Sequence, residues 1–289
     1  MTLANIPLDD SAPVSDAEVA VQVARAAGAR LQQFRRDFQT AAGTDPRAAN
    51  KALRDAADAD SQSLIDALLT AHRPAYAVLS EEAEDSTQRD DSGRVWIIDP
   101  LDGTWEYGLH RDDWAVHVAL WQSDPQPAGE IVLGVVAVPD ADQVFTSASP
   151  IALPQLALER PMRIIASRSR PPKFLPQLAD RLSSVWSALG GPAEVEIVQV
   201  GSVGAKVARL LTGQAEVYVH DSGFYEWDVA APLAVARAAG LAASHLDGSP
   251  VTFNHRPPYV TDLMVARPEV ASAVQSVLAG GAGEPATDA

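Results

Sequence analysis

The sequence predicts a layered protein of mixed α and β structure, in which helices packed on an antiparallel sheet precede an alternating α/β part. Strand patterns follow one another without intervening helices up to about residue 147, and strand and helix patterns alternate after the proline-bearing segment 149–161. The chain has 289 residues and 47% hydrophobic content, enough to bury one large core or two joined ones. We expect an N-terminal part over residues 1–150 and a C-terminal part over 151–289.

Two amphipathic helices are expected at the start of the chain. The first pattern runs from Ser15 to about Gln39, and a Ser15/Glu18 capping box marks its beginning. The second runs from about Pro46 to His72 and ends before Pro74. The strands expected in this part are Ala75 to Ser80, Val95 to Ile98, Trp114 to Leu120, Ile131 to Val138 and Val144 to Ser147.

The C-terminal part alternates short apolar runs with amphipathic patterns, which is typical of α/β structure. The expected strands are Arg163 to Ala166, Val195 to Val200, Glu216 to Val219 and Leu263 to Ala266. The expected helices are Pro172 to Leu189, Val203 to Leu211, Trp227 to Ala239 and Pro268 to Leu278. The tail from Gly280 to Ala289 is expected to be disordered.

Composition and charge exclude several classes of function. The chain has no cysteine, so thiolate metal sites, disulfides and cysteine nucleophiles are all excluded. A formal net charge of -16 counts against a nucleic-acid scaffold or an anionic membrane partner. Neither a signal peptide nor an apolar stretch of about 18 residues is present, so we expect a soluble cytoplasmic protein.

The most informative motif is Asp99-Pro100-Leu101-Asp102-Gly103-Thr104, which follows the apolar run Val95 to Ile98. Pro100 fixes its φ angle and lacks an N–H, so we expect the strand to end there and both aspartates to point into one pocket. Gly103 and Thr104 supply backbone N–H groups where a helix can begin, a setting that favours a phosphate oxygen.

The motif allows two other interpretations. Haloacid-dehalogenase phosphatases use Asp-x-Asp-Gly-Thr, but the extra residue between Asp99 and Asp102 turns the second carboxylate in another direction from the strand. A structural Asp-Gly turn requires neither Asp99 nor Thr104. Both remain open as minor alternatives.

Other acidic residues are candidates for the same site as this motif. Glu81 and Glu82 follow an expected strand, and Asp228 lies in the first turn of an expected helix. Each alone is typical of a solvated surface or a favourable helix dipole. Their combination with Asp99 and Asp102 favours a site that binds a cation, and only hard oxygen or imidazole ligands are present for it.

Taken together, Ser80-Glu81-Glu82, the segment Trp96 to Thr104 and Trp227-Asp228-Val229-Ala230 resemble the three-part signature of the inositol-monophosphatase superfamily. The motifs occur in the family's order over most of the chain. The resemblance implies the layered αβαβα sandwich of inositol monophosphatases and fructose-1,6-bisphosphatases. It also implies a phosphomonoesterase that uses two or three Mg²⁺ ions, is inhibited by Li⁺, and is compatible with a homodimer.

The resemblance also implies a set of site residues. One Mg²⁺ would be held by Glu81, Asp99 and the backbone carbonyl of Leu101, and a second by Asp99, Asp102 and Asp228. Thr104 and Asp58 would orient and deprotonate the attacking water, and Asp58 can contact a third ion. The chain departs from the family here, because Asp55-Ala56-Ala57-Asp58 replaces the usual Val-Thr-x-Ala-Asp.

Further segments resemble the CysQ-type bisphosphate nucleotidases within this superfamily. Trp105-Glu106-Tyr107 is similar to their Lys/Arg-Glu-Phe, Ser167-Arg168-Ser169 to the Ser-Arg-Ser of their adenylate-binding region, and Gly201 to Lys206 to their Gly-Ser-x-x-x-Lys. The substrate contacts that this implies are Gly103, Thr104, Ser167, Arg168, Ser202, Lys206 and Asp221. Arg168 and Lys206 could equally be surface cations. His110, His117 and His220 lack ligand spacing and are expected to pack or face solvent.

The activity implied by the resemblance is Mg²⁺-dependent hydrolysis of the 3′-phosphate of 3′-phosphoadenosine 5′-phosphate by a metal-activated water, a reaction of sulfur metabolism. Inositol monophosphatase or fructose-1,6-bisphosphatase activity on the same metal site is the first alternative. A non-enzymatic metal-dependent binding protein is a remote one, because Asp99, Asp102, Thr104 and Asp228 are all present.

Overall fold

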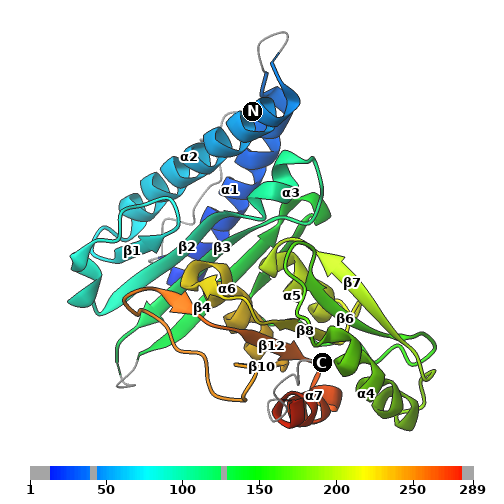
Figure 1. Cartoon of the computed structure of the whole chain (residues 1–289). Helices are drawn as coiled ribbons and strands as arrows, with labels where there is room; N and C mark the ends of the chain where they lie inside the picture. The colour runs from blue at the N-terminus through cyan, green and yellow to red at the C-terminus, as the bar shows by residue number, and fades with distance from the viewer. Residues whose placement is uncertain (1–13, 40–43, 125–128, 282–289) are drawn as a thin grey trace, which may run out of the picture.

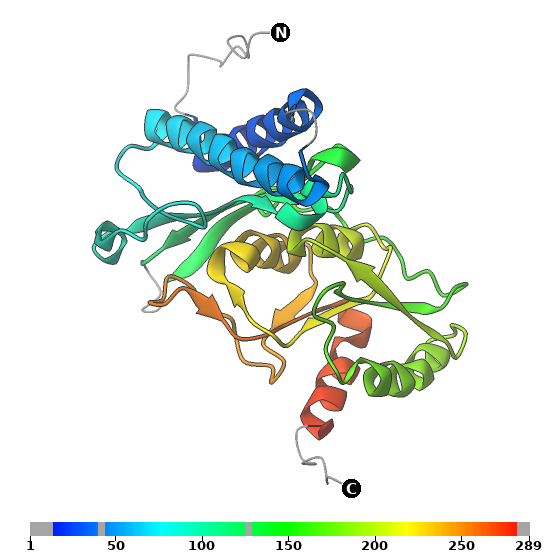
Figure 2. The same ribbon diagram turned by 45° about the horizontal axis from the view of Figure 1, so that its top comes forward.

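The structure is a computed structural model that describes residues 14–39, 44–124 and 129–281. Its elements form five layers, helices–sheet–helices–sheet–helices (Figure 1), which confirms the αβαβα sandwich expected from the sequence. In the view of Figure 2 the two sheets lie above and below a central pair of helices. None of the helices in the described part of the chain combines the length and the apolar character needed to cross a membrane.

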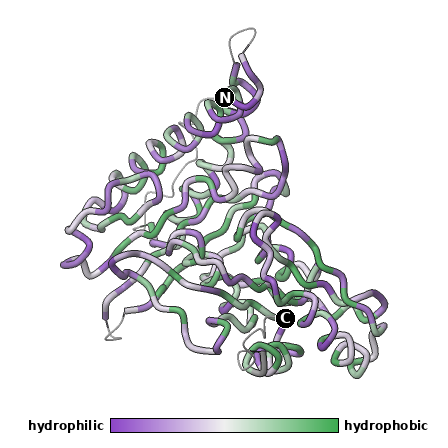
Figure 3. Tube along the Cα trace, in the orientation of Figure 1, coloured by the Kyte–Doolittle hydropathy of each residue, from purple (hydrophilic) through white to green (hydrophobic). Residues whose placement is uncertain are grey.

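The first layer contains the helices α1 (Asp16–Asp37) and α2 (Pro46–His72), close to the ranges predicted. Ser15 and Glu18 form the predicted capping box on α1, and Asp45 caps α2 through the N–H groups of Arg47 and Ala48. Hydrophilic and hydrophobic residues alternate along α2 in Figure 3, as expected of a helix with one buried face. The apolar faces of α1 and α2 pack on the outer side of the first sheet.

The first sheet has the order β1-β2-β3-β4-β5, antiparallel from β2 onward as predicted, whereas β1 pairs with β2 in parallel. Its strands are β1 (Ala77–Ser80), β2 (Arg94–Asp102), β3 (Ala115–Gln122), β4 (Glu130–Val138) and β5 (Gln143–Thr146). The predicted end of β2 at Asp99-Pro100 is wrong. The strand continues to Asp102. Its pairing with β3 is irregular between Asp99 and Asp102, and this bulge accommodates Pro100, which has no N–H to donate, so that pairing resumes at Asp102.

The middle layer consists of α5 (Val203–Leu211) and α6 (Glu226–Ala238), which contact the inner face of the first sheet. Short elements surround these layers: η1 (Thr87–Asp90), α3 (Thr104–Gly108), η2 (Pro139–Ala141), and a two-stranded ribbon of β9 (Phe224–Tyr225) and β11 (Tyr259–Val260). One hydrophobic cluster joins the first sheet, α5, α6 and the second sheet. This shared core brings residues from both sheets to one place.

The second sheet has the order β10-β12-β8-β6-β7 and is mixed, with parallel pairs among β6, β7 and β8. Its strands are β6 (Met162–Ser167), β7 (Val195–Val200), β8 (Val217–His220), β10 (Ala242–Ser244) and β12 (Leu263–Ala266). The helices α4 (Leu175–Ala188) and α7 (Pro268–Gly281) cover its outer face. Gly280 and Gly281 are thus helical, and the rest of the tail expected to be disordered lies outside the described residues.

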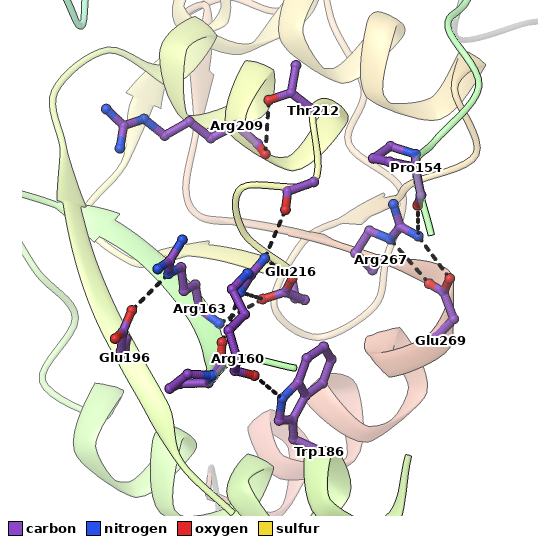
Figure 4. A network of polar contacts seen from close by, with 12 residues as sticks. Pro154, Arg160, Arg163, Trp186, Glu196, Arg209, Thr212, Glu216, Arg267 and Glu269 are labelled. Atoms are coloured by element: carbon purple, nitrogen blue, oxygen red, sulfur yellow. Dashed lines mark hydrogen bonds and ion pairs between the residues drawn. The ribbon is translucent and has the colours of Figure 1, made fainter. Parts of the chain in front are cut away.

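A buried ion-pair network ties the second sheet to the segment that precedes it (Figure 4). Glu216 is 2% exposed, and its carboxylate accepts hydrogen bonds from the Arg160 guanidinium at 2.7 Å and from the Arg163 backbone N–H at 2.7 Å. Arg267, 3% exposed, donates to the Pro154 carbonyl at 2.7 Å. Each buried charge has its partners, so the network is structural and lies outside the acidic site.

Candidate metal centre and substrate cavity

Asp99, Asp102 and Asp228 come together where β2 ends and α6 begins, as predicted. Each offers a carboxylate oxygen, and these oxygens lie within 4.8 Å of one another. Asp99 and Asp102 are 1% and 7% exposed. Asp99 Oδ1 accepts the Leu101 backbone N–H at 3.0 Å, whereas the buried Asp99 Oδ2 has no hydrogen-bond partner in the described part of the chain. An unpartnered buried carboxylate oxygen fits a metal ligand.

Asp102 is held by the start of α5. Its Oδ2 accepts the Ser202 hydroxyl at 2.6 Å and the Gly204 N–H at 2.9 Å, and His117 Nε2 lies 3.2 Å from the same oxygen. Burial by itself raises the pKa of Asp102, but His117 and these donors outweigh it and lower the pKa below its usual value. Asp102 is therefore kept ionised inside the protein.

The other carboxylates repel one another. Burial and the charge of Asp102 raise the pKa of Asp228 to about 7, and burial with the neighbouring charges of Asp228 and Asp58 raises the pKa of Glu81 to about 8. Burial and the Glu82 charge raise the pKa of Asp58 to about 7. Such a cluster is stabilised by a divalent cation, which offsets the repulsion, and its oxygen-only donors are those that Mg²⁺ prefers.

A buried network fixes the segments that present Glu81 and Asp228. Arg89 is 1% exposed and follows the loop after β1; its guanidinium donates to Asn254 Oδ1 at 2.6 Å and to the His255 carbonyl at 2.7 Å. Glu226, the first residue of α6, is fully buried and accepts the N–H groups of Asn254 and His255 at 2.6 and 2.8 Å. The loop after β1 and the start of α6 are thus joined through residues 254–255.

A cavity of about 330 Å³ adjoins the acidic cluster. Its walls come from α2, the β2–α3 turn, the end of β6, α5 and the start of α6, and include Arg54, Asp102, Gly103, Thr104, Trp105, Ser167, Arg170, Lys206 and Asp228. A cavity of this size is large enough for a nucleotide or a sugar phosphate. Gly103 takes a φ of 87°, in the left-handed region that favours glycine, where the chain turns from β2 into α3.

The predicted water-orienting residues stay a prediction. Thr104 lines the cavity, and its hydroxyl donates to the Leu101 carbonyl at 3.0 Å. Asp58 lies on α2, near enough to Glu81 for its charge to raise the Glu81 pKa, and its carboxylate forms no side-chain hydrogen bond within the described residues. Leu101, predicted to offer its carbonyl to a metal ion, is 1% exposed.

Of the predicted substrate contacts, Gly103, Thr104, Ser167 and Lys206 line the cavity, and Arg168, Ser202 and Asp221 are not among its lining residues. Ser202 is 1% exposed and engaged with Asp102. The Lys206 ammonium is buried and donates to the Gly201 carbonyl at 2.5 Å, and burial lowers its pKa to about 8. Asp221 is exposed just beyond β8.

Several residues near the site carry no function predicted from the sequence. His117 was expected only to pack or face solvent, yet it lies beside Asp102; it shares the inner face of β3 with Ala115 and Ala119, a position that the two-residue period of a strand could have revealed. Arg54 lines the cavity and precedes Asp58 by four residues, so helical spacing places both on one side of α2. Arg170, two residues after Arg168, also lines the cavity.

Comparisons with known proteins agree with this fold. The inositol monophosphatase family profile matches residues 12–279. A 3′-phosphoadenosine 5′-phosphate phosphatase of Mycobacterium leprae is 39% identical over 282 residues, covering 93% of this chain and 96% of the relative. A protein of the same name from Mycobacterium tuberculosis is 41% identical over 235 residues, covering 78% and 82%.

Among solved structures, CysQ from Bacteroides thetaiotaomicron, a bacterial member of the inositol monophosphatase family, superposes with a TM-score of 0.69 at 23% identity, covering 87% of this chain and 96% of that one. This likeness supports the fold. The family profile spans nearly the whole described chain, and two of the three sequence motifs supply the acidic cluster of Asp99, Asp102 and Asp228. The chain belongs to the inositol monophosphatase family.

Proposed function

We propose that this protein is a Mg²⁺-dependent phosphomonoesterase that converts 3′-phosphoadenosine 5′-phosphate to AMP and phosphate. The observation that carries the proposal is the cluster of buried Asp99, buried Asp102 and half-buried Asp228 at the wall of a cavity of about 330 Å³. Relatives with 39% and 41% identity that bear the name 3′-phosphoadenosine 5′-phosphate phosphatase support the choice of substrate.

The chain's own oxygen donors would hold the metal. Asp99, Asp102 and Asp228 form the core of the site, with Glu81 and the Leu101 carbonyl completing it. Bound Mg²⁺ supplies Lewis-acid stabilisation of the phosphoryl charge and of the departing ribose oxygen. Two or three ions are expected per site, and the choice of Mg²⁺ over other divalent cations rests on the hard oxygen donors.

The reaction is an in-line hydrolysis. Water forms a bond to phosphorus as the bond between phosphorus and the ribose 3′ oxygen breaks, and the departing oxygen gains a proton. Thr104 and Asp58 are proposed to orient the water and take its proton. Gly103 and Thr104 are proposed to contact phosphate oxygens, and Ser167 and Lys206, which line the same cavity, are proposed to contact the rest of the nucleotide. No phosphorylated protein intermediate is implied.

Side-by-side kinetics test the substrate assignment. Phosphate release would be measured from 3′-phosphoadenosine 5′-phosphate, inositol 1-phosphate and fructose 1,6-bisphosphate at saturating Mg²⁺. We expect the highest kcat/KM with 3′-phosphoadenosine 5′-phosphate. A higher kcat/KM with inositol 1-phosphate or fructose 1,6-bisphosphate would instead assign the protein the corresponding activity of the same family. The absence of phosphate release from all three would reject the proposal.

A further inference from the structure

Two arginines near the cavity have surroundings that differ from those the sequence suggests. Arg168, which resembles a substrate contact in sequence, is absent from the cavity lining, whereas Arg54, which carries no predicted function, is part of it. The distinction matters because a substrate with two phosphates needs cations with free donors, and this chain has a formal net charge of -16.

Arg168 is occupied by internal partners. Its Nη1 lies 2.7 Å from Glu106 Oε1 and its Nη2 lies 2.7 Å from Asp113 Oδ2. The side chains of Glu106 and Asp113 are only 10% and 5% exposed. Arg168 therefore neutralises two carboxylates that burial would otherwise penalise, and the loss of such a partner is costly.

Asp113, held by Arg168, also binds the turn that precedes α5. Its Oδ2 also accepts the Gly201 N–H at 2.7 Å, and its backbone carbonyl accepts the Ser202 N–H at 3.2 Å. The Glu106 carboxyl packs against Gly201 so closely that a Cβ there would lie 2.3 Å from Glu106 Cδ. The 201–202 turn is thus clamped from both sides by the partners of Arg168.

The clamped turn positions Asp102. Ser202 donates to Asp102 Oδ2 at 2.6 Å, and the N–H of Gly204 reaches the same oxygen at 2.9 Å. A continuous chain of contacts therefore runs from Arg168 through Asp113 and the turn to a carboxylate of the acidic cluster. Residues that orient a metal ligand in this way affect metal affinity more than substrate affinity.

Arg54 has the opposite environment. Its aliphatic part passes over Gly108, where a Cβ would lie 2.8 Å from Arg54 Cγ and Cδ, and its guanidinium lies 4.9 Å from the ring centre of Trp105. Trp105 is 57% exposed and also lines the cavity. The buried Arg54 Nε lacks a hydrogen-bond partner, and no ion pair to Arg54 occurs within the described ranges.

We propose that Arg54, supported by Trp105, binds the 5′-phosphate of the substrate, which AMP retains, and that Arg168 is a positioning residue that orients Asp102 through Asp113 and Ser202. This assignment rests on the proposed phosphatase function and refines its substrate site. A guanidinium with unused donors at a cavity that takes phosphates satisfies both its own hydrogen bonds and the anion's charge. Arg168 has no such freedom.

The two arginines predict opposite kinetic signatures. In Arg168→Gln, the Mg²⁺ concentration for half-maximal activity should rise by about ten- to a hundredfold, with the substrate KM at saturating Mg²⁺ nearly unchanged. In Arg54→Gln, the KM and the AMP inhibition constant should rise by about tenfold while the Mg²⁺ requirement stays the same. Arg54→Lys should restore part of the binding, and Arg47→Gln on the same helix serves as the matched control.

Direct binding measurements separate this inference from the phosphatase proposal. Calorimetry of Mg²⁺ with metal-free protein should show weaker binding in Arg168→Gln and Ser202→Ala, with non-additive effects in the double variant because both act through one turn. Calorimetry of AMP should show weaker binding in Arg54→Gln alone. If Arg168→Gln is poorly folded, Arg168→Lys and Ser202→Ala provide the same comparison.

Several outcomes would overturn the assignment. A raised KM with unchanged Mg²⁺ binding in Arg168→Lys would make Arg168 a substrate contact, and unchanged AMP binding in Arg54→Gln would remove Arg54 from the site. If the wild-type protein releases no phosphate from 3′-phosphoadenosine 5′-phosphate, the function fails, but the Mg²⁺ calorimetry still decides the assignment of Arg168.

Discussion

The Ser202 hydroxyl donates a hydrogen bond of 2.6 Å to Asp102 Oδ2, joining two residues that lie 100 positions apart in the chain. This bond links the motif at the end of the first sheet to the helix α5 that follows the second sheet's strand β7. Since a neighbouring oxygen of the acidic cluster lies on Asp228 of α6, the site exists only when the two sheets are packed together.

Asp102→Asn should abolish nearly all turnover while the fold stays intact, because the cluster loses one charge and the core loses no volume. We expect phosphate release to fall by several orders of magnitude, as when a metal no longer stabilises the leaving oxygen. The measurement is kcat/KM together with a thermal unfolding curve. Asp180→Asn, an exposed change on α4, is the control, and retention of more than about a tenth of wild-type activity in Asp102→Asn would refute the metal assignment.

Li⁺ should inhibit the protein at fixed Mg²⁺, and chelation of Mg²⁺ should remove its activity. A monovalent ion in the acidic cluster offsets less of the negative charge on the phosphoryl group and the departing oxygen than a divalent ion does. Phosphate release would be followed across Mg²⁺ and Li⁺ titrations, with Na⁺ or K⁺ at equal ionic strength as the control. A Li⁺ response equal to that of Na⁺, or full activity in chelator, contradicts this mechanism.

Gly201→Ala should destabilise the protein and reduce its affinity for Mg²⁺. The new methyl group would lie 2.3 Å from Glu106 Cδ, and Glu106 cannot easily retreat because Arg168 holds it. Overpacking of this kind costs about 1 to 3 kcal/mol. Urea unfolding and Mg²⁺ calorimetry would be compared with those of Gly93→Ala, where the nearest atom is 3.8 Å away. A Gly201→Ala protein as stable as the wild type would show that the turn is not clamped.

Asp140→Asn should lower the free energy of unfolding at neutral pH by about 1.5 to 3 kcal/mol, the value of hydrogen bonds to a charged group. The Asp140 carboxylate accepts Trp114 Nε1 at 2.8 Å, and Arg35 Nη2 at 2.5 Å forms an ion pair with it. Burial opposes ionisation, but the bonds from Gln32, Arg35 and Trp114 outweigh it and lower the pKa of Asp140 below its ordinary value of 3.8.

The pH dependence of this difference follows from the lowered pKa. The stabilisation is fully present above the ordinary carboxyl pKa and is lost as pH falls through the lower pKa of the folded state, because Asp140 then becomes protonated. Urea unfolding of the wild type and Asp140→Asn at neutral and acidic pH would measure it. A stability difference that stays constant, or grows, as the solution is acidified would contradict the proposed ion pair.

Local sequence signals determined the elements whose ends are set by nearby residues. The capping box of Ser15 and Glu18 and the end of α2 before Pro74 gave helix bounds close to those observed, since caps act within one turn. The carboxylates of the acidic cluster were also predicted, because Asp99 and Asp102 share one strand end and Asp228 lies in a recognisable helix start.

Tertiary structure decided the partners of the buried polar groups. Sequence similarity suggested that Arg168 contacts the substrate, but its guanidinium pairs with Glu106 and Asp113 across 62 and 55 residues of sequence. Such pairs depend on the order and packing of the two sheets, which short patterns do not specify. The continuation of β2 beyond Pro100 also depends on tertiary structure. Pairing with the neighbouring strand β3 extends β2 to Asp102 although Pro100 has no N–H to donate.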